Sequence, residues 1–237
     1  MKKWPCLLLA LVMVFCLTAC GEKDEKTEEG TQNTTQAAES GKPSDVLTKE
    51  EQDALDHALE LLETIAYSRN GLINQMVYEG YDEAASAAAA DHTGLDWKEQ
   101  ALKSAREYLH YLPMSLTGVA QMLEYDLFTP EEASYALEQL TDVDWDAEAD
   151  EAVAYLLKQG VSRVGLEENL QSRGFTREQI SKAVGKTGDV DWNDQAVLCA
   201  KGYLEAMEFT RESLLDQLRY EGFTFAQAEY AADQCGF

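Results

Sequence analysis

The chain has 237 residues, and its 44 acidic and 19 basic side chains give a formal net charge of −25 at pH 7. Such a chain repels anionic surfaces. Affinity for nucleic acid depends on lysines and arginines that neutralise phosphates, so nucleic acid is excluded as an expected partner. A basic protein segment or a cation would suit the charge better.

Residues 1–19 have the pattern of a signal peptide. Lys2 and Lys3 precede the apolar run CLLLALVMVFCL, which is too short for a comfortable membrane span. The run ends in LTAC, residues 17–20, which resembles the lipobox of bacterial lipoproteins. This resemblance implies acylation, palmitate included, at Cys20 and a protein held by lipid at the outer face of the cell membrane. The alternative is an ordinary secretory signal with a chance cysteine.

Residues 20–47 are predicted to form a disordered acidic tether. They are rich in Glu, Thr, Gln, Gly and Ser, and they offer almost nothing to bury. A flexible segment of roughly 27 residues spans about 30 Å on average. The tether would therefore hold the folded part away from the membrane.

The remaining residues repeat one pattern four times. The copies are predicted at 48–95, which is degenerate, and at 96–143, 144–190 and 191–237. Each contains one aromatic residue at a turn, namely Tyr81, Phe128, Phe175 and Phe223. A tryptophan preceded by aspartate follows the first three of these, at Trp97, Trp145 and Trp192. These aromatic residues are the predicted structural anchors of the repeats.

Each copy is predicted to form three helices, the last two of which imitate a helix-turn-helix. In the second copy, Asp96 is the expected N-cap of the first helix, with Glu99 completing a capping box. Thr129, Pro130 and Glu132 are a start signal for the third helix. No segment alternates as a strand would, so the fold class is all-α, a tandem array of four three-helix repeats. One unit buries little surface, so a continuous core is expected, with the tryptophans between successive units.

The recurring pattern combines A-x-x-Y-L, a Ser/Thr-capped helix, G-F-[ST]-x-x-x-A and V-D-W. It resembles the repeats of host cell surface-exposed lipoproteins, the Ltp family, over about residues 53–237. The resemblance implies anchoring outside the cytoplasmic membrane of a Gram-positive bacterium. Members borne by temperate phages exclude superinfecting phages by blocking DNA transfer into the cell, and are thought to engage the tail tape-measure protein. Those members carry two copies, whereas this chain has four.

Two functions are consistent with these features. The first is a membrane-anchored protein-binding module, which could act in phage superinfection exclusion. The alternative is an envelope structural or spacer lipoprotein that binds a cell-wall or host-protein ligand. Exposed aromatic side chains at equivalent repeat positions would favour the module. The candidates are Tyr78, Tyr125 and Tyr220, with Ser172 in the third copy, although half-buried core positions are the expectation for these tyrosines.

Four cations in the third copy, Arg173, Arg177, Lys182 and Lys186, allow two interpretations. The favoured one is a solvated face that balances neighbouring acids, and the other is a binding patch for an anionic partner. The compartment would also permit a disulfide between Cys199 and Cys235, although two half-buried thiols are the simpler expectation.

No catalytic constellation is found in the sequence. The three histidines, His57, His92 and His110, fall at unrelated repeat positions and lack metal-ligand spacing. The expectation is a protein that is not an enzyme and that uses no metal or cofactor.

Overall fold

The computed structural model describes residues 46–237, so the predicted signal peptide, Cys20 and most of the predicted tether lie outside the described residues. Within this range the chain is all-α and has no strand, as the sequence predicts. The helices are α1 (Lys49–Thr64), α2 (Arg69–Tyr78), α3 (Glu83–His92), α4 (Trp97–Tyr111), α5 (Leu116–Tyr125), α6 (Pro130–Gln139), α7 (Trp145–Leu157), α8 (Arg163–Ser172), α9 (Arg177–Gly185), α10 (Trp192–Ala206), α11 (Arg211–Tyr220) and α12 (Phe225–Gln234).

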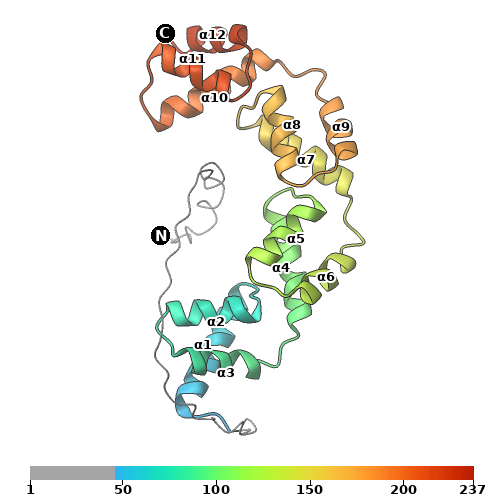
Figure 1. The fold of residues 1–237 in the computed structure, drawn as a ribbon, viewed down its shortest axis with the longest axis vertical. Coiled ribbons are helices and arrows are strands. Elements are labelled where there is room, and N and C mark those ends of the chain that lie inside the picture. Colours follow the sequence, from blue (N-terminus) through green and yellow to red (C-terminus); the bar gives the residue numbers. More distant parts are fainter. Residues whose placement is uncertain (1–45) are drawn as a thin grey trace, which may run out of the picture. The chain divides into compact units, whose positions relative to one another are not determined.

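Consecutive triplets of helices form four units, which we call repeat 1 (α1–α3), repeat 2 (α4–α6), repeat 3 (α7–α9) and repeat 4 (α10–α12) (Figure 1). In every unit the second and third helices contact the first. None of these helices combines the length and the apolar character that crossing a bilayer requires.

Capping side chains explain where the helices begin. Thr48 accepts the Glu51 N–H at 3.2 Å, and the Glu51 carboxylate accepts the Thr48 N–H at 2.7 Å. Asp96 caps α4 by accepting the Lys98 N–H at 2.9 Å. The predicted capping box with Glu99 is wrong, because that carboxylate instead accepts a hydrogen bond from the Tyr135 hydroxyl of α6. The third helices of repeats 2, 3 and 4 have capping boxes, and the box in repeat 2 is the one predicted from Thr129 and Glu132.

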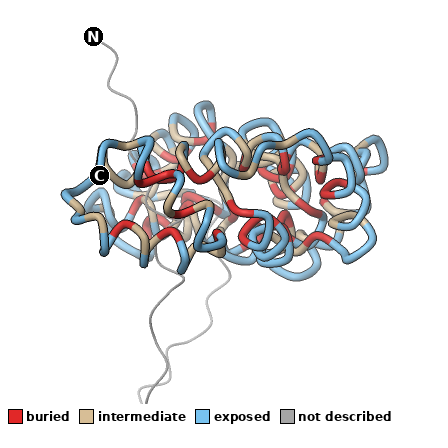
Figure 2. The backbone as a smooth tube through the Cα atoms, turned by 90° about the horizontal axis from the view of Figure 1, so that it is seen from above, coloured by how far each residue is buried: buried red, intermediate tan, exposed pale blue. Residues whose placement is uncertain are grey.

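Each repeat encloses its own hydrophobic core, so the expectation of one continuous core is wrong. The buried backbone stretches recur on the inner sides of the helices in Figure 2. In repeat 1, Leu72 and Met76 are fully buried between α1 and α3, which meet through alanines such as Ala58 and Ala89. Because these small residues let the first and third helices approach closely, the core closes within one repeat.

A tryptophan at the start of each later repeat contacts the repeat before it. Trp97, the first residue of α4, packs against the core of repeat 1. Trp145 packs in the same way against the core of repeat 2, and Trp192 packs against that of repeat 3. Neighbouring repeats are therefore joined by a half-buried indole at the end of each closed core.

Candidate protein-binding surface

The second helix of three repeats ends in an exposed tyrosine. Tyr78, Tyr125 and Tyr220 are the last residues of α2, α5 and α11, and their exposed fractions are 87%, 62% and 78%. The expectation that they are half-buried core residues is wrong. The tyrosine lies two and six residues after the two buried apolar positions of its helix, which at 100° per residue places it on the opposite face.

Other apolar side chains accompany these tyrosines around the turn into the third helix. Val77 precedes Tyr78, and Leu127 follows Tyr125 by two residues; their exposed fractions are 41% and 43%. In repeat 4, Phe225 begins α12 with 54% of its surface exposed. We call this set, with the three tyrosines, the turn surface.

Repeat 3 lacks the aromatic residues of the turn surface. Ser172 replaces the tyrosine, and Arg177 stands at the position of Phe225. A binding surface formed by the turn residues is therefore apolar in repeats 1, 2 and 4 and polar in repeat 3.

Contacts from the first helix hold these turns in place. In three repeats, the residue after the turn tyrosine is an acid whose carboxylate is bound by a side chain of the first helix. The pairs are His57 with Glu79, Tyr108 with Asp126, and Tyr203 with Glu221. Burial raises the pKa of Tyr108. Burial also raises the pKa of Asp126, and the hydrogen bond from the Tyr108 hydroxyl opposes that rise. These contacts restrain the turn and reduce the ordering that a partner would have to impose.

Repeat 3 reverses the charge at this position. Arg173 replaces the acid, and its guanidinium lies over the Tyr155 ring at 5.5 Å from the centroid. Burial lowers the pKa of Arg173, and the cation contacts the aromatic face. The same two positions are therefore paired in repeat 3 by different chemistry.

The four cations predicted as a candidate patch do not form a free basic surface. Lys182 lies 2.9 Å from both Asp146 and Glu178, and these hydrogen bonds raise its pKa. Lys186 lies 2.5 Å from Asp150. The Arg173 guanidinium lies over the Tyr155 ring. Of the four cations, Arg177 remains exposed at the start of α9. Most of this charge is therefore balanced within repeat 3.

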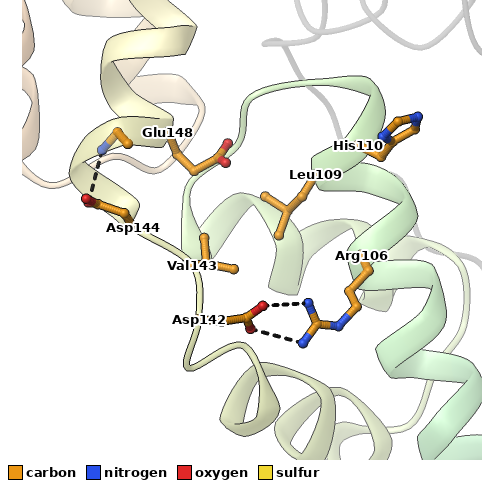
Figure 3. Close-up of a pocket in the computed structure, with 8 residues that line it drawn as sticks. Arg106, Leu109, His110, Asp142, Val143, Asp144 and Glu148 are labelled. Atoms are coloured by element: carbon orange, nitrogen blue, oxygen red, sulfur yellow. Dashed lines mark hydrogen bonds and ion pairs between the residues drawn. The ribbon is translucent and has the colours of Figure 1, made fainter.

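A shallow cavity of about 320 Å³ lies between α4 and the start of α7 (Figure 3). The Arg106 guanidinium donates to both carboxylate oxygens of Asp142, at 3.0 and 3.1 Å. Glu148 accepts the Met114 N–H at 3.3 Å, while burial raises its pKa. Leu109 and Val143 lie between these groups in Figure 3, and His110 points away from them. Glu148 thus links repeat 3 to repeat 2, whereas the Arg106–Asp142 pair lies within repeat 2.

The cysteines of repeat 4 are both free thiols in the structure, as in the simpler of the two expectations, and the alternative disulfide is not formed. Cys199 is buried in the core of the repeat, and Cys235 at the end of α12 packs against the same cluster. Among residues 46–237, no group of histidine, cysteine and acidic side chains could hold a metal ion.

Comparison with known proteins identifies the class of protein. The model of a family described as host cell surface-exposed lipoproteins matches residues 96–140 and 191–234. The chain is 34% identical to Ltp, described as a superinfection exclusion protein from the Streptococcus thermophilus temperate phage TP-J34. That match covers 39% of this chain and 97% of Ltp, with a TM-score of 0.37. The chain therefore belongs to the Ltp family of host cell surface-exposed lipoproteins. No curated protein matches it.

The family model matches two of the four repeats, those with helices α4–α6 and α10–α12. Both carry the turn tyrosine, the acid that follows it and the tyrosine of the first helix that binds this acid. Repeat 1 lacks one of these, since His57 takes the place of the first-helix tyrosine. Repeat 3 lacks two, since Ser172 replaces the turn tyrosine and Arg173 replaces the acid.

Proposed function

We propose that this chain excludes superinfecting phages by binding a phage protein at the cell surface before DNA reaches the cytoplasm. The observation that carries the proposal is the 34% identity to Ltp over 97% of that superinfection exclusion protein. In this proposal, lipid at Cys20 anchors the chain to the outer face of the membrane. The phage protein is one that delivers DNA, and the tail tape-measure protein is the candidate.

The turn surface supports a binding module over a spacer. A spacer needs only polar faces, whereas three exposed tyrosines recur here at one repeat position. Tyrosine is enriched in protein interfaces because it combines a large rigid apolar area with a polar hydroxyl. Three such turns on one chain would also increase the affinity for a partner that presents several sites.

The proposal is tested by challenging a susceptible Gram-positive host that expresses the full chain with a panel of phages. Adsorption and DNA transfer are measured separately, beside the variant Cys20→Ser. We expect adsorption to be unchanged and DNA transfer to be blocked for at least one phage, and we expect Cys20→Ser to lose this block. Equal DNA transfer with and without the chain, for every phage in the panel, would overturn the proposal.

A further inference from the structure

A serine joins each of the first three repeats to its successor. This serine is the N-cap of the second helix, where its Oγ accepts the N–H of the glycine three residues later at 2.9 Å. The same Oγ donates, at 2.5 Å, to a backbone carbonyl at the turn of the next repeat. The serine–carbonyl pairs are Ser68 with Asp126, Ser115 with Arg173, and Ser162 with Glu221.

The glycine three residues after each serine is required because the carbonyl of the next repeat approaches it closely. A Cβ added at Gly71, Gly118 or Gly165 would lie 3.3, 3.0 or 3.2 Å from the carbonyl oxygen of the next repeat. These distances are shorter than ordinary van der Waals contact, so a larger side chain would push the next repeat away. The sequence S-x-x-G therefore provides both the hydrogen bond and the space for a following repeat.

Repeat 4 has T-x-x-S in place of S-x-x-G. The Thr210 hydroxyl oxygen accepts the Ser213 N–H at 3.2 Å, and the Ser213 hydroxyl oxygen accepts the Thr210 N–H at 3.0 Å. Thr210 and Ser213 thus form a capping box with each other, and both residues are exposed. The Ser213 side chain occupies the direction from which the carbonyl approaches in the other three repeats.

We propose that Thr210 and Ser213 terminate the array by closing repeat 4 against any further repeat. The partner excluded is a helix-ending turn such as Glu79–Gly80 of repeat 1. A Cβ added at Gly80 would meet no heavy atom within 4 Å in the described part of the chain. The two ends of the array therefore do not match, and copies of the chain do not join end to end.

The first test moves the terminating residues inside the array, as Ser162→Thr with Gly165→Ser. Helix α8 should persist, because α11 begins with the same cap, whereas the joint between repeats 3 and 4 should be lost. Nitroxide labels at the exposed Glu168 and Glu212 report the distance between the two repeats in the full chain with its five native cysteines replaced by alanine. We expect the width of the distance distribution to increase at least about twofold, with unchanged helical circular dichroism.

The matched control, Thr210→Ser with Ser213→Gly, should leave the width unchanged because it alters no residue of the joint between repeats 3 and 4. An unchanged width in the variant Ser162→Thr/Gly165→Ser would overturn the proposal. Loss of helical signal in that variant would also overturn it, because the serine and glycine would then be needed by the helix rather than by the joint.

The second test adds a fifth repeat. A second copy of residues 191–237 placed after Phe237 puts its first aspartate 15 residues after Phe223, the spacing from Tyr81 to Asp96. Labels across this new joint should give a narrow distance distribution only when the first copy carries Thr210→Ser and Ser213→Gly. A narrow distribution with Thr210 and Ser213 intact would contradict termination.

Discussion

Gly222 is a residue at which a single methyl group should weaken the joint between repeats 3 and 4. Its φ is +86°, and an added Cβ would lie 2.7 Å from the Ser162 Oγ of the preceding repeat. Gly80 has a φ of +103° and occupies the same turn position in repeat 1, but nothing lies within 4 Å of its added Cβ. A non-glycine residue in the left-handed region costs about 1 kcal/mol or more from backbone strain alone.

We therefore predict that Gly222→Ala lowers the free energy of unfolding by more than Gly80→Ala, which carries only the backbone cost of about 1 kcal/mol. Urea denaturation of both variants measures the difference. Equal losses in the two variants would show that the turn of repeat 4 is not held against Ser162.

Cys199 should be an unreactive thiol in the folded chain. Burial, followed by the charge of Glu221, raises its pKa to about 12, so almost no thiolate exists at pH 8. We predict that iodoacetamide at pH 8 modifies Cys235 in the native protein and modifies Cys199 only after unfolding in urea, as measured by peptide mass spectrometry. Rapid native labelling of Cys199 would contradict its burial. Labelling of both cysteines only after reduction would indicate a disulfide.

The surroundings of single side chains were the hardest feature to predict from the sequence. Helical periodicity places Tyr125 opposite the buried Val119 and Leu123, yet a half-buried core position was expected for it. Glu99 stands at the right spacing for a capping box, but Tyr135 from another helix competes for its carboxylate. A contact between α4 and α6 decides the second case, and spacing within one helix does not contain it.

At the scale of elements, Trp145 should stabilise the repeat that precedes it in the chain. It begins α7 of repeat 3, but its indole packs against the core of repeat 2. Truncation of this half-buried side chain, Trp145→Ala, should cost about 2 kcal/mol of transfer free energy.

We predict that Trp145→Ala increases hydrogen exchange in α4–α6 more than in α7–α9, whereas Trp145→Phe has a smaller effect. Mass spectrometry of the exchanged peptides measures both. Greater loss of protection in α7–α9 would mean that the indole mainly supports its own repeat.

The helices themselves follow closely from the sequence. Thr129 with Pro130 and Glu132 gives a start signal that the structure confirms at α6. The closure of each core was not predicted, because it depends on how closely alanines such as Ala58 and Ala89 let two helices approach. The serine–carbonyl joints were also missed, although the repeated S-x-x-G and its replacement by T-x-x-S in the last copy provide a signal.

For the whole molecule, the residues that hold the repeats together differ from the exposed tyrosines that are proposed to bind a partner. The Trp and Ser–Gly contacts link successive repeats, and the exposed side chains of Tyr78, Tyr125 and Tyr220 take no part in them. Each turn is restrained by the first helix of its own repeat, as Tyr203 restrains Glu221 in repeat 4. The exposed tyrosines are therefore free to serve binding in the proposed function.

The most direct test of the account replaces the three turn tyrosines by serine, the residue that repeat 3 already has at this position. The variant Tyr78→Ser/Tyr125→Ser/Tyr220→Ser is compared with the intact chain and with Tyr111→Ser, which removes a 68% exposed tyrosine elsewhere. DNA transfer is measured in cells challenged with a phage that the intact chain excludes. We predict that the triple variant, at equal surface abundance and helical content, admits phage DNA while Tyr111→Ser still blocks it. Undiminished exclusion by the triple variant would contradict the assignment of binding to the turn surface.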